Sequence, residues 1–217
     1  MKETTAKKKF MWNMAGSLCN SLSSMLLLII VNRISGESRG GFFALAYSTA
    51  QLLFSVGGFE IRPVQSTDIK NKFTFNQYFT SRMLNCIIML ICMIGYIVVN
   101  GYTGVEAFTV FWILGYRMVE AVADVYSGLF QQRERIDISG KEMLMRSGIS
   151  TITFTIILWL TDNLLYAAMT LTLTSLVIML FYDLHMKKYF EPTPVHLEWK
   201  GILGIYNACW PLFVSSF

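Results

Sequence analysis

The stretch that decides the fold is Glu106–Gln132, EAFTVFWILGYRMVEAVADVYSGLFQQ. It is apolar enough to cross a bilayer, yet it carries Arg117, Glu120 and Asp124 in its middle. Their spacing of i, i+3 and i+7 places all three side chains on one face of a helix. A helix that begins at Val105 puts the arginine about 18 Å along its axis, near the midplane of an apolar core about 30 Å thick. A charge at that depth costs about 2.5–3.5 kcal/mol unless it faces other helices or water.

The composition is that of an integral membrane protein. Hydrophobic residues make up 54% of the chain and charged residues only 15%, whereas soluble domains carry about 25% charged residues. Inside lipid, only helices and closed barrels satisfy every backbone polar group. Long continuous apolar runs favour helices, because barrel strands alternate over short segments. The sequence therefore predicts an all-α, polytopic membrane helix bundle.

We expect six membrane-spanning helices and the start of a seventh. The predicted spans are Phe10–Val31, Gly41–Phe59, Met83–Val99, Val105–Gln131, Ser147–Thr161 and Leu164–Tyr182. The last run, Ile205–Phe217, has too few residues to cross about 30 Å as a helix. We therefore expect the chain to be a fragment, with a six-helix bundle at residues 1–204 and the start of a seventh helix, in a truncated second lobe, at 205–217.

The polar segments between these runs set the predicted orientation. They are residues 32–40, 60–82, 100–104, 132–146, 162–163 and 183–203. Fifteen of the 18 Lys and Arg residues fall in the N-terminal tail and in the second, fourth and sixth segments, against two, Arg33 and Arg39, on the other side. This asymmetry predicts a plasma-membrane protein with a cytoplasmic N-terminus. The division of the basic residues among four segments also argues against nucleic-acid binding.

Two stripes of small and polar residues run along the first two predicted spans. They are Asn13, Ser17, Asn20 and Ser24 on the first span, and Ala44, Ser48, Gln51, Ser55 and Gly58 on the second. Such stripes suit hydrogen bonding and close packing between membrane helices, and they equally suit the wall of a water-filled cavity. On the second interpretation, Asn13, Asn20 and Gln51 join Arg117 as candidate cavity residues.

The charged face of the fourth span is the one group of residues whose chemistry indicates a function. A guanidinium binds phosphate through a fork of donors that an ammonium cannot match, so Arg117 is the candidate substrate-binding cation. Glu120 and Asp124 are candidate sites for a coupling proton or sodium ion. Pairing of the arginine with Glu120 within the helix is the purely structural alternative. We find no soluble-enzyme motif and no Cys/His set of metal-ligand spacing, so we predict no catalytic residue, metal or cofactor.

Three stretches of the chain carry a resemblance to a known family. They are RPVQSTDIKNKFTFNQYFTSR at 62–82, GYRMVEAVADVYSGLFQQRERIDISGKEMLMR at 115–146 and NACWPLFVSS at 207–216, behind a basic tail and an Asn/Ser-rich first span. The chain resembles polysaccharide-biosynthesis flippases, the Wzx-like members of the multidrug/oligosaccharidyl-lipid/polysaccharide (MOP) exporter superfamily.

The resemblance implies the N-terminal lobe of a MATE-like transporter, which has two pseudo-symmetric bundles around a central cavity. It implies movement of undecaprenyl-diphosphate-linked oligosaccharide from the inner to the outer leaflet, driven by a gradient of H+ or Na+. Arg117 would then bind the diphosphate or an acidic sugar, and Glu120 and Asp124 would couple the ion. Membrane lipids, a polysaccharide polymerase and glycosyltransferases are the implied partners.

Three other classes of protein compete with this interpretation. A small-molecule or multidrug exporter of the same superfamily should favour acidic groups without a central arginine, so Arg117 counts against it. A membrane enzyme of polysaccharide assembly needs a sizeable outer loop for its site, and residues 32–40, 100–104 and 162–163 are too few to build one. For a scaffold that transports nothing, charges at the midplane would be a needless cost.

Overall fold

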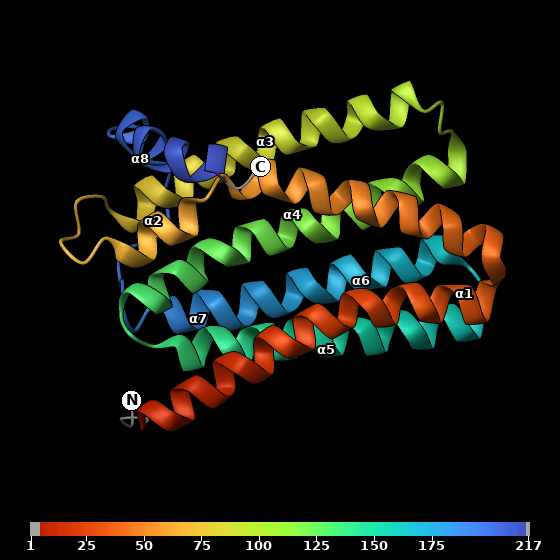
Figure 1. The fold of residues 1–217 in the computed structure, drawn as a ribbon, viewed down its shortest axis with the longest axis horizontal. Coiled ribbons are helices and arrows are strands. Elements are labelled where there is room, and N and C mark those ends of the chain that lie inside the picture. Colours follow the sequence, from red (N-terminus) through yellow and green to blue (C-terminus); the bar gives the residue numbers. More distant parts are fainter. Residues whose placement is uncertain (1–4, 216–217) are drawn as a thin grey trace.

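The structure, a computed structural model, describes residues 5–215, and this part of the chain is helical without strands. The elements are α1 (Ala6–Gly58), α2 (Ile61–Thr67), α3 (Phe75–Val99), α4 (Gly104–Gln132), α5 (Ile136–Thr161), α6 (Leu164–Ile178), η1 (Met179–Asp183), α7 (Leu184–Lys187) and α8 (Ile202–Ser215). The predicted all-α bundle is confirmed (Figure 1).

Helix α1 is a hairpin of two legs that meet at Gly36. This glycine has φ 85° and ψ 170° inside an otherwise helical stretch, a conformation that is open to glycine because it lacks a Cβ. The first leg runs away from the N-terminus and the second leg runs back beside it (Figure 1). The predicted polar turn over residues 32–40 is therefore wrong, because one glycine makes the turn and its neighbours stay helical.

Three helices extend into segments that were expected to be loops. Helix α3 begins at Phe75 behind a capping box formed by Thr74 and Gln77, and α5 begins at Ile136. The sixth helix continues through η1, a single π-helical segment, into α7. Arg82 and Arg146 therefore lie inside helices. Hydropathy ended the predicted spans at these charges, whereas buried partners keep the charges in helical segments.

By length and composition, four helices of the described chain can cross a membrane. They are α1, α3, α5 and the continuous helix Leu164–Lys187. Helix α4 is also long, at 29 residues, or about 43 Å, but it carries the charged residues. The chain is thus a polytopic helical bundle. The count of six spans, which takes the two legs of α1 separately, stays a prediction.

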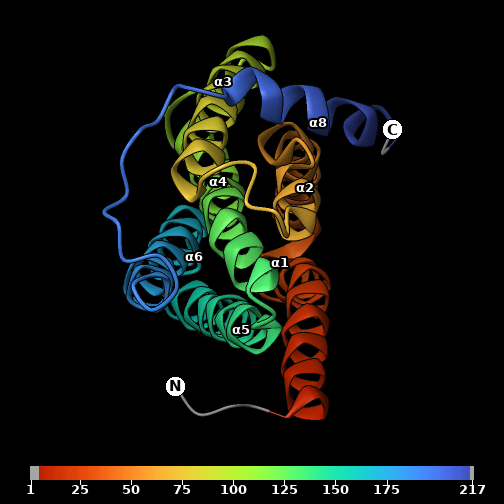
Figure 2. The same ribbon diagram turned by 90° about the vertical axis from the view of Figure 1, so that its left-hand side faces the viewer.

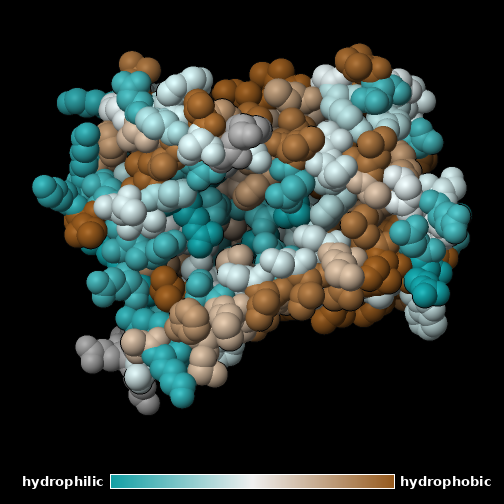
Figure 3. Space-filling view, viewed as in Figure 1, coloured by the Kyte–Doolittle hydropathy of each residue, from teal (hydrophilic) through white to brown (hydrophobic). Residues whose placement is uncertain are grey.

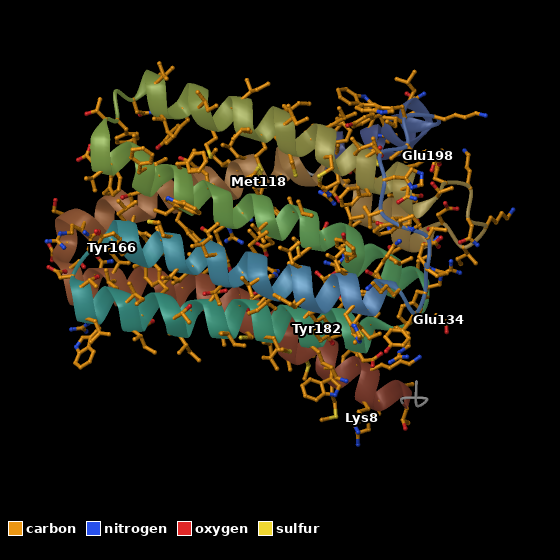
Figure 4. The ribbon with its side chains drawn as sticks, turned by 180° about the vertical axis from the view of Figure 1, so that it is seen from behind. Lys8, Met118, Glu134, Tyr166, Tyr182 and Glu198 are labelled. Carbon is orange, nitrogen blue, oxygen red and sulfur yellow. The ribbon has the colours of Figure 1, made fainter. Side chains whose placement is uncertain are left out.

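The bundle has two distinct ends. The first turns of α1 lie at one end together with α2, α7 and α8, and the bend of α1 at Gly36 lies at the other (Figure 1). From behind, Lys8, Glu134 and Glu198 mark the first end and Tyr166 the second (Figure 4). Helix α8 packs against α3 and α2 and lies across the bundle (Figure 2). Its assignment to the start of a second lobe stays a prediction.

Three of the cations counted for the predicted orientation are buried. Arg82, Arg146 and Lys187 are 0%, 2% and 2% exposed, so they do not belong to the loop charges. The remaining basic residues at the N-terminal end still outnumber Arg33 and Arg39 at the opposite end. The cytoplasmic location of the N-terminus stays a prediction on that basis.

A polar layer separates two apolar cores along α4. The core toward the Gly36 end contains Val110, Ile113 and Leu114 of this helix, and the other core contains Tyr126 and Leu129. The segment between them carries the three charged residues that were singled out in the sequence. The bundle therefore brings its buried charges together in its middle, which is where the candidate site lies.

Candidate functional site

Arg117 is the centre of the site and is only 4% exposed. Its Nη2 donates to the hydroxyl of Tyr47 at 2.7 Å and to Oγ of Ser24 at 3.3 Å, and its Nη1 pairs with Glu120. The guanidinium carbon lies 4.6 Å from the centre of the Tyr47 ring, a geometry that adds a cation–π attraction. The arginine is thus held by both legs of α1 and by its own helix.

Glu120 receives compensation from two arginines and one amide. Besides Arg117, its Oε1 accepts a hydrogen bond from Nδ2 of Asn20 at 2.9 Å and lies 3.7 Å from Nη2 of Arg146. Breaking a buried ion pair by removing one partner costs about 3–5 kcal/mol. A second arginine beside the same carboxylate therefore keeps Glu120 compensated when the first is removed.

Arg146 belongs to a second ion pair on α5. Its Nε donates to Oε1 of Glu142 at 2.6 Å, with the two residues four positions apart. Both side chains are buried. Sequence reasoning missed this pair because it assigned residues 132–146 to a loop. The spacing of Glu142 and Arg146, which suits pairing along a helix, was the available signal.

Asp124 belongs to a separate cluster. Its two carboxylate oxygens pair with Nη1 of Arg62 at 2.9 Å and with Nη2 of Arg82 at 2.8 Å. Arg82 also donates to the carbonyl of Gly57 at 2.7 Å, at the end of α1. The three charges of α4 therefore share a face but divide into two clusters, and Asp124 fixes α2, α3 and the end of α1 to α4.

Two cavities lie along this face and share Gln51. The first, the charged cavity, has a volume of about 410 Å³ and is lined by Asn20, Glu120, Asp124 and Arg146 among others. The second, the tyrosine cavity, has a volume of about 560 Å³. Its lining is Ser24, Leu28, Ala44, Tyr47, Ser48, Gln51, Leu52 and Arg117. On the face of the molecule seen in Figure 3, hydrophilic side chains gather around a hollow in the middle.

The candidate residues chosen from the sequence fall into three places. Asn20, Gln51, Glu120 and Asp124 line the charged cavity, and Gln51 also lines the tyrosine cavity beside Arg117. Asn13 lies instead where α1 crosses α5. A Cβ atom built on Gly140 would come within 2.5 Å of the Cα atom of Asn13, so the two helices touch there through their backbones.

Arg117 is partly paired and borders a cavity. Arg117 lines a cavity, but one of its amino groups is occupied by Glu120. Nε of Arg117 is buried and has no hydrogen-bond partner within residues 5–215. An anion that enters the tyrosine cavity can therefore exchange with Glu120 for the guanidinium, while Arg146 and Asn20 stay beside the released carboxylate.

The fold and the site define a polytopic helical membrane protein with a charged interior and cavities between its helices, features typical of a membrane transporter. The chain belongs to the polysaccharide biosynthesis protein family, whose family model matches residues 6–217. No curated protein and no solved structure matches it. The family match confirms the resemblance to Wzx-like flippases. It also assigns the chain a flippase-type role in polysaccharide synthesis, since members are generally transporters and not enzymes.

Proposed function

We propose that the protein flips undecaprenyl-diphosphate-linked oligosaccharide from the inner to the outer leaflet of the plasma membrane, coupled to an ion gradient, for the assembly of a surface polysaccharide. The family supports the pathway. One observation supports an anionic substrate: the guanidinium of Arg117 is only 4% exposed and borders a cavity in the bundle. Such a buried cation is costly in a membrane unless a bound anion or a carboxylate compensates its charge.

In this proposal Arg117 contacts the diphosphate. Asn20 and Gln51, which line the cavities, supply amide groups for phosphate or sugar oxygens. Asn13 was predicted to join them, but its place at the α1–α5 crossing lends that role no support. A fork of two donors suits a phosphate better than the single ammonium of a lysine does.

Glu120 and Asp124 are the proposed coupling carboxylates. Each is held by two arginines in this structure, so a proton or sodium ion that binds to either must weaken those pairs. Protonation of Glu120 would release Arg117 toward the substrate. Asp124 lies closer than Arg117 to the end of α4 that we place in the cytoplasm, and it would respond to the ion on that side.

The partners follow from the proposed chemistry. Glycosyltransferases must build the oligosaccharide on its lipid carrier before it is flipped, and a polymerase or ligase must consume it afterwards. The N-terminus and α2 face the cytoplasm in this scheme, because the basic residues gather at that end of the bundle.

Reconstitution of the full-length protein in vesicles tests the function. Lipid-linked oligosaccharide is placed in the inner leaflet, and its arrival in the outer leaflet is measured with a membrane-impermeant glycosidase. We expect arrival to depend on the protein and to slow when ionophores collapse the ion gradient. Efflux of small organic cations without movement of the lipid would instead assign the protein to the multidrug exporters.

A further inference from the structure

Asp183 is a buried carboxyl that the proposed function does not use. It ends η1, the π-helical segment within the continuous helix Leu164–Lys187, and such insertions frequently occur at functional sites. The residue is 1% exposed, and neither of its carboxylate oxygens accepts a hydrogen bond from any residue in the range 5–215. Because an ionised carboxylate in such a place is strongly disfavoured, the carboxyl needs a proton or a cation.

The groups that face Asp183 come from several elements. Helix α5 presents Glu142 and Arg146, and α4 presents the phenol of Tyr126. Lys187 lies four residues further along, but its ammonium bonds the carbonyl of Thr193 and lies over the ring of Phe75. The other titratable groups of the packed elements are Glu106, Tyr116, Arg117, Glu120 and Asp124 on α4, Asp137 and Lys141 on α5, and Tyr166, Tyr182 and His185 on the continuous helix. Asp137 is bonded to Arg135.

Asp183 differs from the other buried carboxyls around Arg146 in its pairing. Glu120 pairs with Arg117 and Arg146, and Glu142 pairs with Arg146. Arg62 also acts on Glu142, but it is bonded to Asp124. Within residues 5–215, no side chain hydrogen-bonds or ion-pairs with Asp183, and burial in a low dielectric without such a partner favours the neutral form of a carboxyl. A proton on Asp183 accordingly removes the uncompensated charge.

Arg146 connects this carboxyl with the charged cavity. It lines that cavity and lies between two carboxylates, at 2.6 Å from Glu142 and 3.7 Å from Glu120. A negative charge on Asp183 draws Arg146 away from Glu120, which then holds Arg117 more firmly. A neutral Asp183 leaves Arg146 free to approach Glu120, and Arg117 then becomes available to an anion.

We propose that Asp183, with Glu142 beside it, is a proton-binding site whose occupancy sets the anion affinity of the cavities through Arg146. The inference rests on the proposed function for the identity of the anion. Its sign follows from electrostatics, because a proton taken up near a site strengthens the binding of an anion there. Proton and anion therefore bind cooperatively, and each raises the affinity for the other by the same factor.

The test measures anion binding to the full chain in lipid nanodiscs over a series of pH values. A long-chain alkyl sulfonate serves as the probe, because its charge does not change with pH. We expect affinity to fall on the order of tenfold as Asp183 loses its proton, because one unit charge acting on another across about 10 Å has roughly this effect at an effective dielectric constant of about 20. Calorimetry in buffers of different ionisation enthalpy should show proton uptake on binding.

Two variants separate the proton site from the rest of the molecule. Asp183→Asn should bind the sulfonate tightly at every pH and take up no proton, since a neutral amide mimics the protonated acid. The substitution breaks no hydrogen bond within the described residues, so we expect it to fold. Asp162→Asn changes an exposed aspartate at the opposite end of the bundle and should titrate like the unmodified protein.

Infrared spectroscopy distinguishes failure of this inference from failure of the proposed function. The carboxylic-acid band of Asp183 should be present in the unmodified protein and absent from Asp183→Asn. Two results overturn the proton site and leave the anion site standing. One is an affinity for the sulfonate that does not depend on pH, and the other is an Asp183→Asn variant whose affinity changes with pH as that of the unmodified protein does. Absence of sulfonate binding at every pH, with the band present, overturns the anion site instead.

Discussion

The hydroxyl of Tyr47 accepts a hydrogen bond from Nη2 of Arg117 at 2.7 Å and donates one to Oγ of Ser24 at 3.0 Å. One phenol thereby connects the two legs of α1 with α4. The two legs border the cavities that hold the candidate site. The position of the guanidinium consequently depends on how the hairpin closes on α4, which links the bend at Gly36 with the site.

Arg117→Ala should abolish polysaccharide export while leaving the protein in the membrane. Glu120 keeps Arg146 and Asn20 as partners when the guanidinium is removed, so the bundle retains a compensated carboxylate. Arg117→Lys should restore only part of the export, because an ammonium lacks the forked donors. Surface polysaccharide is measured in cells beside the amount of protein in membrane fractions.

Arg39→Ala is the matched control, since this arginine is exposed and pairs with Asp162 at the end of the bundle where α1 bends. It should export normally. Normal export by Arg117→Ala, at an equal level of protein, would contradict a substrate role for Arg117.

Tyr47→Phe should lower export several-fold without abolishing it. The ring over the guanidinium remains, but the hydroxyl that accepts from Arg117 is lost. A buried charged donor left without its acceptor costs about 1–3 kcal/mol, part of which Ser24 recovers by accepting alone. Export and thermal stability in detergent are both measured. Tyr166→Phe, at an exposed tyrosine, should change neither, and an equal loss in both variants would remove any special role for Tyr47.

Arg82→Ala should destabilise the protein more than Arg62→Ala, although both arginines bind Asp124. The side chain of Arg82 is fully buried and also bonds the carbonyl of Gly57, whereas that of Arg62 is 29% exposed. Breaking a buried pair costs about 3–5 kcal/mol, and partly exposed pairs contribute about 1 kcal/mol or less. Melting temperatures in detergent give the ranking, and equal losses would show that burial does not set the strength of these pairs.

Gly16→Ala should separate α1 from α5. A Cβ at this position would lie 2.9 Å from the carbonyl carbon and the Cα of Gly140, and backbone atoms cannot move aside as a side-chain tip does. Overpacking of this kind costs about 1–3 kcal/mol. Gly95→Ala is the control, because a Cβ there meets no atom within 4 Å. If both variants melt at the same temperature, the close crossing does not contribute to stability.

The sequence placed the helices well and their ends poorly. Apolar runs predicted helices correctly because lipid forces the backbone to satisfy its own hydrogen bonds. Hydropathy ended the predicted spans at Arg82, Arg146 and Asp183, which the structure holds inside continuous helices. A buried charge is acceptable only when distant residues compensate it, and hydropathy does not contain that information. The loop predicted at residues 32–40 has another cause: its polar residues Arg33, Glu37 and Arg39 are exposed, as in a loop, but only Gly36 leaves the helical conformation.

By itself the sequence determined the all-helical membrane class, the family, and the face of α4 on which Arg117, Glu120 and Asp124 lie, because each depends on local composition and spacing. The pairing of Arg117 with Glu120, three residues apart on one helix, was already an alternative in the sequence. Tertiary structure alone decided the distant partners, which are Arg62 and Arg82 for Asp124, and Arg146 and Asn20 for Glu120. Charge pairing over such sequence separations depends on which helices pack together, so the division of one charged stripe into two clusters became visible only in the folded bundle.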